Sequence, residues 1–329
     1  MADLPPGADI SDEPVAEGDP VDVSILMVGY KTRDELARCL ESVQRTTTDV
    51  SYEIVLVDNN SEDGTVEMIR RDFPAVKLVA LDENLGFGRG VNLAATKAAG
   101  RYYLLLNPDT IVHEGAIGAL MRFAQDHPTA GLVGGRTLRP DGTHDPGSAW
   151  GRPTVWSTIS FGLGLSRIFK GTAWFDPEAI PDWDRSTPRE VGVVTGCLVF
   201  VSREVWDELG GFDTDFFMYS EDTDLSMRAW EAGYHPMITP DAVITHVVGA
   251  SSAIPTNRRV LVLKGKSTLF RKHFRTPLDR VLVVLLACGV GVRALMALAV
   301  RAISRGRKGN EEMSWVGAWQ RRGEWLGGW

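Results

Sequence analysis

The sequence predicts an α/β fold in which a mostly parallel central sheet is covered by helices on both faces. From residue 21 onward, apolar runs of strand length alternate with segments whose apolar residues recur at helical spacing. The first of these runs is continuously apolar, as a strand buried on both faces would be. Polar residues follow the runs where ligands bind in such sheets, beyond the carboxyl ends of the strands.

Composition limits the classes of protein to which the chain can belong. Its 329 residues, 44% of them hydrophobic, suffice for one large domain or two smaller ones. Acids exceed bases by 43 to 35, which argues against a nucleic-acid partner because phosphates need a basic face. Cys39, Cys197 and Cys288 are widely spaced and form no C-x-x-C pair, so we expect a reducing compartment without disulfides or structural zinc.

The N-terminus is expected to lie outside the fold. Residues 1–20 combine acids and prolines with no lysine or arginine, a composition that cannot repay the entropy cost of ordering. We therefore expect a disordered acidic tail. The same residues lack the features of a secretory signal, so the catalytic part is expected to face the cytoplasm.

The region from 21 to 110 is predicted to contain strands and helices in alternation. VSILMVGY is continuously apolar, and the segment after it carries Leu36, Leu40 and Val43 at helical spacing. Gly100 closes the third helix. The predicted strands are 23–30, 51–60, 75–83 and 102–110, and the predicted helices are 32–46, 61–73 and 88–100.

The second half is less regular. The stretch from 134 to 190 is rich in glycine, proline and tryptophan and allows no detailed assignment, although we expect it to contact an acceptor. A strand pair or bent strand is predicted in 190–203, followed by helices at 204–212 and about 223–232, and a strand at 241–246.

Three carboxylates, Glu221, Asp222 and Asp224, precede the helix predicted at 223–232. Acids at a helix N-terminus interact favourably with its dipole and cap free N–H groups. One or two acids beside Ser220, itself a suitable cap, would satisfy that structural explanation. We therefore expect at least one of the three carboxylates to take part in chemistry.

A second polar cluster follows the predicted strands. Asn107 and Asp109 flank a proline at a strand end, where their oxygens would suit Mg²⁺ or Mn²⁺ or would simply form an Asx-Pro turn. His246 ends a later strand and is either a metal ligand or an ordinary hydrogen-bonded histidine. The residues at the four strand ends are Gly29-Tyr30, Asp58-Asn59-Asn60, Asp82-Glu83-Asn84 and Asn107-Pro108-Asp109.

The glycine-rich segment ENLGFGRGVNLA at 83–94 raises the possibility of a dinucleotide site. The G-x-G-x-x-G pattern fails because Val91 stands at its third glycine, and the motif normally follows the first strand. We therefore expect a loop whose backbone approaches a phosphate or nucleoside, with Asn84 and Gly86 in the loop and Arg89 available to supply charge.

Taken in order, these segments resemble the family 2 glycosyltransferases, and especially bacterial rhamnosyltransferases that act on cell-wall or O-antigen lipid precursors. The resemblance covers residues 21–275. It implies a GT-A fold, a nucleotide-diphospho-sugar donor, a divalent metal and inversion at the anomeric carbon. The motifs that carry it are VSILMVGYKTRDELARCLESV, EIVLVDNNSEDGT, ENLGFGRGVNLA, YYLLLNPDT, VTGCLVFVSREVWDELGGFDTDFFMYSEDTDLSMRAWEAGY and ITHVVG.

The resemblance also implies roles for particular residues. Asp222 matches the general base, next to Glu221 in the catalytic pair, and we expect both neighbouring acids to raise its basicity by repulsion. Asn107 and Asp109 occupy the Asp-x-Asp metal motif with its first acid replaced, so Asp109 would be the main ligand and His246 would complete the shell. The donor would contact Gly29, Tyr30, Asp58, Asn84, Gly86, Arg89 and Asn107.

The C-terminal region 276–329 is expected to associate with a membrane. The apolar stretch 280–303 is interrupted by Arg293, whereas a spanning helix needs ~20 apolar residues without a central charge. A membrane-surface or re-entrant helix is the preferred interpretation, and a buried core helix is the alternative. Basic residues follow, and Trp315, Trp319, Trp325 and Trp329 would lie at the lipid headgroups.

The resemblance therefore implies a metal-dependent inverting glycosyltransferase that moves a sugar, rhamnose from dTDP-rhamnose, to a lipid-linked or polysaccharide acceptor. It would act at the cytoplasmic face of the plasma membrane as a peripheral or partly soluble protein. A nucleotidyltransferase or an inactive sugar-nucleotide-binding scaffold at the membrane are the alternatives. The sequence indicates no oligomeric state.

Overall fold

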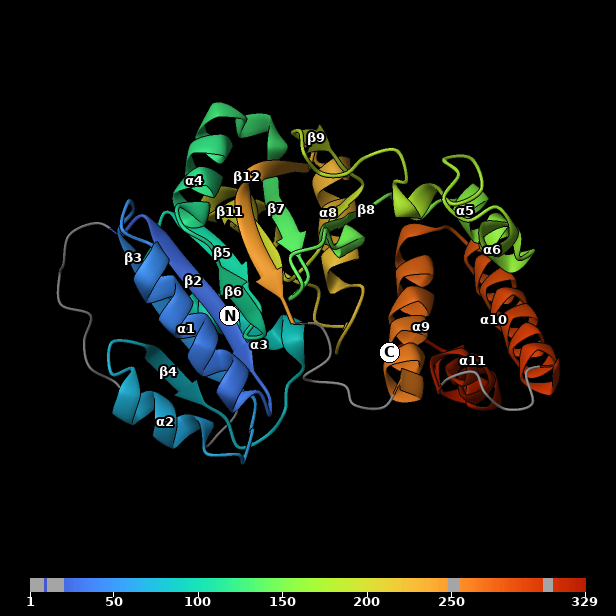
Figure 1. Ribbon diagram of the computed structural model, residues 1–329, viewed down its shortest axis with the longest axis horizontal. Helices are drawn as coiled ribbons and strands as arrows, with labels where there is room; N and C mark the ends of the chain where they lie inside the picture. The colour runs from blue at the N-terminus through green and yellow to red at the C-terminus, as the bar shows by residue number, and fades with distance from the viewer. Residues whose placement is uncertain (1–8, 11–20, 248–254, 304–309) are drawn as a thin grey trace. The chain divides into compact units, whose positions relative to one another are not determined.

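The computed structural model describes residues 9–10, 21–247, 255–303 and 310–329 (Figure 1). The chain forms two compact units. The first, called here the sheet unit, comprises Met1–Trp150, Asp184–Thr214 and Asp222–Ser251. The second, called the helical unit, comprises Gly151–Trp183, Asp215–Glu221 and Ser252–Trp329.

The first half of the sheet unit matches the predicted alternation. Its four central strands run parallel in the order β4, β3, β2, β5, with the predicted helices between them. The strands are β2 (Val23–Gly29), β3 (Tyr52–Asp58), β4 (Lys77–Ala80) and β5 (Tyr102–Leu106). The helices are α1 (Arg33–Thr46), α2 (Thr65–Asp72) and α3 (Phe87–Thr96).

Beyond β5 the sheet is mixed. β11 (Leu198–Ser202) lies antiparallel between β5 and β7 (Leu132–Leu138), and β7 is parallel to β12 (Met237–His246). The short strands β6 (Thr110–Val112) and β9 (Arg189–Glu190) pair antiparallel with β12. The predicted α/β fold is therefore confirmed, with its parallel character concentrated in the first half.

Three further short strands complete the described pairings. β1 (Asp9–Ile10) pairs antiparallel with β4, and β8 (Ala149–Trp150) pairs with β10 (Val193–Val194). Apart from Asp9–Ile10, the predicted acidic tail lies outside the described residues.

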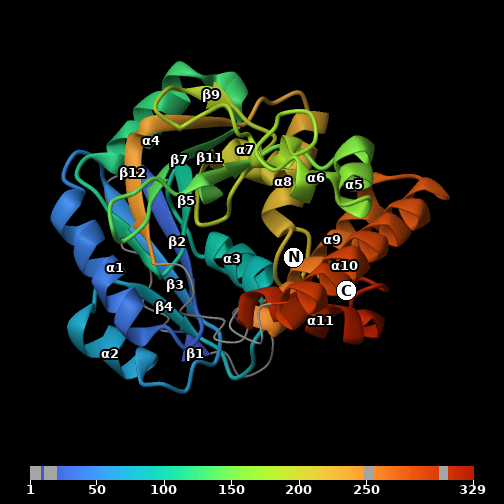
Figure 2. The same cartoon turned by 45° about the vertical axis from the view of Figure 1, so that its right-hand side comes forward.

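Helices cover both faces of the sheet because alternate strand residues point to opposite sides. Ile25 and Met27 of β2 belong to a core shared with α1, α2 and α4 (Ala116–Asp126). On the other face Val28 meets Gly90 of α3, and Tyr103 contacts Trp206 of α7 (Arg203–Leu209). α1 and α3 accordingly lie on opposite sides of the sheet (Figure 2).

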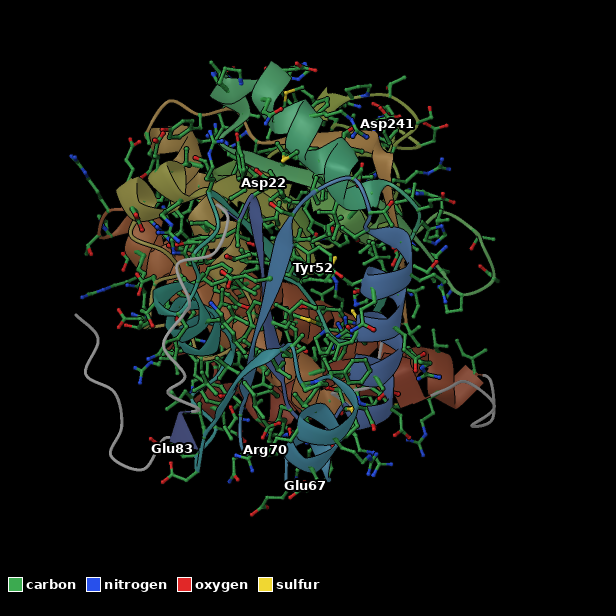
Figure 3. All side chains as sticks on the ribbon, turned by 90° about the vertical axis from the view of Figure 1, so that its left-hand side faces the viewer. Asp22, Tyr52, Glu67, Arg70, Glu83 and Asp241 are labelled. Carbon is green, nitrogen blue, oxygen red and sulfur yellow. The ribbon has the colours of Figure 1, made fainter. Side chains whose placement is uncertain are left out.

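The carboxyl ends of the parallel strands meet at one edge of the sheet. Glu83, just after β4, lies at the opposite end of the sheet from Asp22, which precedes β2 (Figure 3). The loops that follow β2, β3, β4 and β5 therefore come together, as the polar strand ends predicted.

Strand β7 was not assigned from the sequence because it contains two glycines, which normally weaken a strand. Both lie where the chain is crowded. A Cβ on Gly134 would come within 2.6 Å of Ile238 and Val194, and one on Gly135 would meet the Ala242 carbonyl. The glycines therefore allow β7 to pack closely against β12.

The helical unit has its own apolar core. α9 (Pro255–His273) contributes Val260, Leu263 and Phe270, which pack with residues of α10 (Leu278–Ile303). α11 (Asn310–Gln320) and the chain after it add Ala318 and Trp325. This unit does not begin at the predicted boundary near residue 275, since it also includes α9 and residues 151–183.

The sequence suggested that Arg293 interrupts the apolar surface of α10. In the structure it does not, because its side chain is buried within the helical unit. It donates to the carbonyls of Phe161 and Gly289 and to the Ser166 hydroxyl, at 2.9 to 3.1 Å. Its guanidinium also lies 3.7 Å from the centre of the Phe161 ring. Phe161 belongs to α5 (Val155–Gly162), which packs along α10 with α6 (Leu165–Ile168).

The predicted headgroup position of the C-terminal tryptophans is wrong for Trp325, whereas Trp315 and Trp329 are partly exposed. Trp325 is fully buried and donates to the Ala318 carbonyl. Trp315 stacks under Arg259, and Trp329 contacts Lys264 and Phe217. Only Trp319 ranks among the exposed large hydrophobic residues of the described chain, because the other three rings complete the packing of the helical unit.

Candidate functional site

The turn after β5 brings two of the predicted metal ligands together. The Asn107 N–H donates to the Cys197 carbonyl, and the Thr110 hydroxyl donates to the Asn107 carbonyl. β6 begins at Thr110, which pairs with His246 at the end of β12. Residues 108–109 form a turn, and this turn places Asp109 beside His246.

Asp109 and His246 form a direct, partly buried contact. His246 Nε2 lies 3.2 Å from Asp109 Oδ1, and the two side chains are 17% and 11% exposed. Within the described residues, no group of three or more His, Cys, Asp or Glu side chains is placed to hold a metal ion. An imidazole and a carboxylate, with Asn107 in the same turn, fit a divalent cation whose other ligands come from a bound diphosphate and water.

Asp222 lies at the same edge of the sheet. Its Oδ2 accepts a hydrogen bond from the Gly196 N–H at 3.0 Å, and its Oδ1 accepts one from the Thr223 N–H at 2.7 Å. The residue after Gly196 is Cys197, whose carbonyl is bonded to Asn107. One short segment thus links the predicted base to the predicted metal turn.

The Cys197 thiol reports the proximity of both acids. Burial, and then the carboxylates of Asp109 and Asp222, raise its pKa to about 12. Both carboxylates therefore lie near Cys197, in agreement with the hydrogen bonds that join Gly196 to Asp222 and Cys197 to Asn107.

Burial also raises the pKa of Asp222, against the lowering effect of its hydrogen bonds from Gly196 and Thr223. The sequence predicts that repulsion by Glu221 and Asp224 raises the basicity of Asp222, but the cause in the structure is burial. Asp224 is turned to Arg228, 2.7 Å away, and Glu221 is itself buried. Asp222 keeps some exposure to solvent, which makes it the accessible member of the catalytic pair.

The chain enters α8 (Glu221–Glu231) through two unusual residues. Tyr219 and Ser220 have φ values of +68° and +73°, although neither is a glycine. An N-cap residue normally has extended backbone, so the predicted capping role of Ser220 is not supported. Left-handed backbone at such residues costs about 1–3 kcal/mol each and is characteristic of functional sites.

Asp58 lies at the end of β3, beside Gly29. Its two carboxylate oxygens accept hydrogen bonds from the hydroxyl and the N–H of Ser61, at 2.5 and 3.0 Å. Burial raises its pKa in spite of these bonds. Tyr30 follows Gly29 and remains partly exposed. The structure thus groups these three predicted donor contacts and adds Ser61, which sequence reasoning missed.

Asn59 is a second residue that sequence reasoning missed. Its Nδ2 donates to the Gly86 carbonyl and its Oδ1 accepts from the Leu85 N–H, at 2.9 and 3.3 Å. Asn84 Oδ1 accepts from the Gly86 N–H. The loop with Asn84 and Gly86 is therefore tied to the loop after Asp58. The paired asparagines after Asp58 were the available signal.

The exposed Arg89 side chain donates twice to the Thr214 carbonyl, each time at 3.2 Å, and a neutral carbonyl leaves its predicted charge available. Asn92 exchanges two hydrogen bonds with the backbone of Phe212. A Cβ on Gly196 would lie 3.7 Å from the Phe87 ring and 3.5 Å from Asp222 Cβ. The start of α3 therefore lies beside Asp222.

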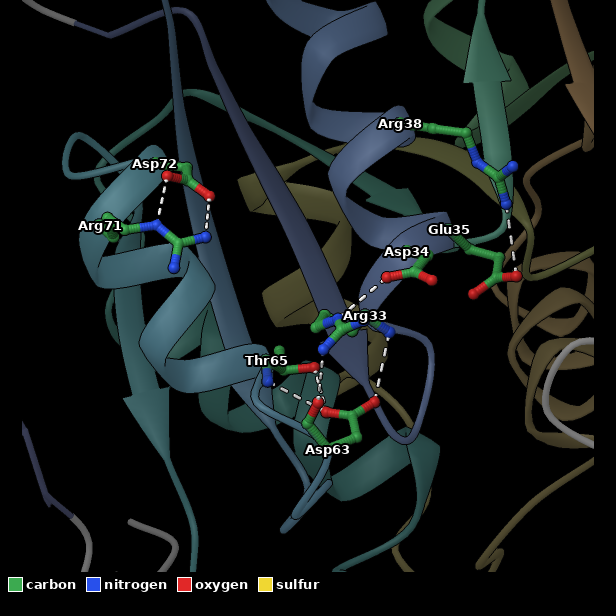
Figure 4. Close-up of polar contacts among 8 residues, drawn as sticks. All are labelled: Arg33, Asp34, Glu35, Arg38, Asp63, Thr65, Arg71 and Asp72. Carbon is green, nitrogen blue, oxygen red and sulfur yellow. Dashed lines mark hydrogen bonds and ion pairs between the residues drawn. The ribbon is translucent and has the colours of Figure 1, made fainter.

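Asp63 organises the loop that follows Asp58 (Figure 4). Its Oδ1 caps the start of α2 by accepting from the N–H and hydroxyl of Thr65, at 3.0 and 2.6 Å. Its Oδ2 accepts the Arg33 N–H at the start of α1, and Arg33 Nη1 donates to the Asp63 carbonyl. These bonds join the beginnings of two helices next to the predicted base-binding residues.

The combined arrangement offers a carboxylate with a raised pKa, a neighbouring pair of Asp109 and His246 that is the predicted cation site, and loops that present buried polar groups. Comparisons with known proteins agree with it. Residues 24–209 match the family model described as Glycosyl transferase family 2, and residues 179–275 match that of Glycosyl transferase family group 2.

Similar proteins include N-acetylglucosaminyl-diphospho-decaprenol L-rhamnosyltransferase of Mycobacterium tuberculosis (strain CDC 1551 / Oshkosh). It is 31% identical over 235 residues, which cover 68% of this chain and 75% of the relative. O-antigen biosynthesis protein RfbC of Myxococcus xanthus is 30% identical over 70% of this chain and 18% of its own length.

Among solved structures, the mannosyltransferase PcManGT from Pyrobaculum calidifontis, in complex with GDP-Man and Mn²⁺, has a similar fold. The TM-score is 0.56 at 19% identity, and the match covers 94% of this chain and 88% of the other.

Removal of one partner from the ion pair between Arg228 and Asp224 should lower the stability of the fold measurably. Arg228→Met would leave the Asp224 carboxylate, which is 2% exposed, without its cation. We expect a cost of about 3 kcal/mol, the lower end of the range for a broken buried pair, because Arg228 itself is 23% exposed. Chemical denaturation followed by tryptophan fluorescence measures it.

The double variant Arg228→Met/Asp224→Leu should recover most of this loss, since no charge is then left buried. Arg122→Met, which removes an exposed partner of Asp49, is the matched control with an expected cost of ~0–1 kcal/mol. A loss in Arg228→Met no larger than in Arg122→Met would contradict the interpretation.

Proposed function

The chain belongs to glycosyl transferase family 2, and we propose that it transfers a sugar, with inversion, from a nucleoside diphosphate to an acceptor hydroxyl. The family and the fold make the protein a glycosyltransferase. The observation that carries the proposal is that Gly196 holds Asp222 while the next residue, Cys197, is bonded to Asn107 in the turn of Asp109.

We assign the donor as dTDP-rhamnose and the acceptor as a lipid-linked sugar or growing glycan. The support is the 31% identity with a relative whose name specifies an L-rhamnosyl donor group and a sugar-diphospho-lipid acceptor. The second relative is named for O-antigen synthesis, a related kind of product.

In the proposed reaction Asp222 acts as the general base. The acceptor oxygen attacks the anomeric carbon while its proton passes to the Asp222 carboxylate. The bond between the anomeric carbon and the diphosphate oxygen breaks, and the nucleoside diphosphate leaves with the electron pair. The hydrogen bonds from Gly196 and Thr223 hold the carboxylate in a fixed orientation during proton transfer.

Asp109, His246 and Asn107 would hold Mg²⁺ or Mn²⁺ together with the donor. A bound divalent cation would neutralise the charge that develops on the leaving diphosphate. The direct contact between Asp109 and His246 keeps both side chains oriented before the donor arrives. Because the described residues supply few ligands, we propose that metal and donor bind together.

The donor nucleoside would occupy the edge formed by Gly29, Tyr30 and Asp58, with Asn84 and Gly86 beside it. Ser61 and Asn59 act as positioning residues, since they hold the Asp58 carboxylate and the Gly86 loop. Arg89 would act through the Thr214 carbonyl to position the chain before α8. Glu221 stays assigned to the catalytic pair, next to the accessible base.

Family membership favours glycosyl transfer, the predicted chemistry, over the alternative of nucleotidyl transfer. An inactive sugar-nucleotide-binding scaffold would share the fold without turnover. Incubation of the full chain with dTDP-rhamnose, Mg²⁺ and a lipid-linked acceptor separates these alternatives, because only the enzyme releases acceptor-dependent nucleoside diphosphate.

We also propose that the helical unit docks on the cytoplasmic surface of an anionic bilayer. Within the described residues, α10 is the single helix long and apolar enough to cross a membrane, and 44% of its apolar window is buried. Its outer side is apolar, with Val284, Leu295 and Ile303 exposed by 60%, 69% and 84%. A half-buried helix of this kind suits lying on a membrane.

A second exposed apolar group lies around α6 of the helical unit. Leu163, Ile168 and Trp174 are exposed by 61%, 66% and 69%. Arg167 and Lys170 are exposed among them and would contact anionic headgroups. Part of the predicted basic stretch after α10 lies outside the described residues.

Asp222→Asn should reduce transfer by at least about 100-fold, because the amide cannot accept the hydroxyl proton. Donor affinity, measured by isothermal titration with Mg²⁺ and dTDP-rhamnose, should stay unchanged. Asp241→Asn, at an exposed position of β12, is the matched control. Near-normal turnover in Asp222→Asn would refute the role of the base.

The pH dependence of transfer should reflect the raised pKa of Asp222. The base works only when ionised, so activity is lost as pH falls through that pKa. The acid limb of kcat/KM should therefore lie above the ordinary aspartate value of about 4. Circular dichroism over the same range separates loss of activity from unfolding. An acid limb at or below the ordinary value contradicts the assignment.

Flotation with vesicles of phosphatidylcholine and phosphatidylglycerol tests the membrane proposal. The wild-type chain should float, and Ile168→Glu/Leu295→Glu should float much less because two exposed apolar contacts become charged. Val262→Glu is the matched control, since Val262 is an exposed apolar residue of α9. Equal flotation of the variants, or no flotation of the wild type, would argue against docking.

A further inference from the structure

A group of basic side chains in the sheet unit has no part in the mechanism above. Arg136 lies on β7, and Arg139 and His144 lie in the loop that follows it. Arg185 reaches the same region from the segment before β9. These four residues are called here the basic cluster.

The basic cluster contains buried donors that are unsatisfied. Both ring nitrogens of His144 are inaccessible to solvent and have no hydrogen-bond partner among the described residues. The Nε of Arg136 is likewise inaccessible to solvent and has no hydrogen-bond partner among the described residues. Buried polar groups are nearly always paired with protein, ordered water or an ion, so these nitrogen atoms call for a partner from outside the chain.

The unsatisfied groups lie in a positive environment. Arg185 is 2% exposed and is held by the carbonyls of Pro146 and Ala149, at 3.1 and 3.3 Å. Its backbone has a φ of +63°, an uncommon conformation for an arginine. Burial lowers the pKa of His144, and the charges of Arg185, Arg136 and Arg139 lower it further, with only Asp145 opposing them. An anion would relieve this excess.

The basic cluster adjoins the catalytic residues. The Thr195 hydroxyl donates to the Gly147 carbonyl at 2.6 Å, and the Thr195 N–H donates to the Ser148 carbonyl. Thr195 directly precedes Gly196, which holds Asp222. Asp145, 3.8 Å from Arg139, also contributes to the potential at Cys197. A molecule bound at the basic cluster would therefore extend toward the base.

We propose that the basic cluster binds the diphosphate of a lipid-linked acceptor and thereby directs the acceptor hydroxyl to Asp222. This inference rests on the proposed function. The donor diphosphate is assigned to the Asp109 turn and does not need these residues. Guanidinium groups match phosphate oxygens in a two-pronged geometry, which suits Arg136 to the task.

The test compares two acceptors that carry the same sugar. One is N-acetylglucosaminyl diphosphate on a short isoprenoid chain, and the other is a neutral alkyl glycoside of N-acetylglucosamine. Arg136→Gln should raise KM for the diphosphate acceptor by about tenfold or more, the effect of one lost charged hydrogen bond. KM for the neutral acceptor and for the donor should not change. Arg122→Gln, an exposed arginine of α4, is the matched control.

A direct binding measurement keeps the inference independent of turnover. Inorganic pyrophosphate, added without metal, should raise the pKa of His144, followed by NMR of its imidazole and assigned with His144→Gln. Arg136→Gln should reduce this shift. Arg136→Lys keeps the charge but loses the paired donors of the guanidinium group. Its shift should lie between those of the wild type and Arg136→Gln, and it replaces Arg136→Gln if that variant does not fold.

The outcomes separate the two proposals. Equal effects of Arg136→Gln on both acceptors, or no response of His144 to pyrophosphate, would overturn acceptor binding by the basic cluster. Absence of transfer by the wild-type chain to either acceptor would overturn the proposed function, and a pyrophosphate response would then still identify the basic cluster as an anion site.

Discussion

The pairing of β11 with β5 is the interaction on which the candidate site depends. It sets Cys197 opposite Asn107, so that the residue before Cys197 holds Asp222 while Asn107 begins the turn that carries Asp109. These contacts join segments about ninety residues apart in the sequence through backbone hydrogen bonds, which do not depend on side-chain identity. Loss of this register would separate Asp222, the proposed base, from Asp109 of the proposed cation site, even with every predicted residue present.

Around that pairing, each functional side chain is held by a neighbour that takes no direct part in chemistry. Gly196 and Thr223 orient Asp222, Ser61 orients Asp58, and Asn59 fixes the loop of Gly86. Such support matters because proton transfer and phosphate binding demand fixed geometry. Asp224 belongs to the same supporting group, since its charge is balanced by Arg228 rather than directed at Asp222.

In the helical unit, the burial of one charged residue decides which side of α10 is charged. Arg293 is turned inward and satisfied by two carbonyls and a hydroxyl. The outer side of α10 therefore remains uncharged from Val281 to Val300, although the sequence places an arginine in that span. The two interpretations of the region, a membrane-surface helix and a core helix, describe different sides of the same helix.

The alternation of strands and helices, the family and the polar residues at the strand ends could be predicted from the sequence, because they follow from local periodicity and from motifs in fixed order. The pairing of the strands after β5, the packing of α9 with α10 and the bond of Arg89 to a carbonyl could be found only in the folded chain. The tertiary structure also decided that burial, not repulsion, raises the pKa of Asp222. The physical reason is that desolvation and hydrogen-bond partners depend on residues distant in the chain, which no local pattern records.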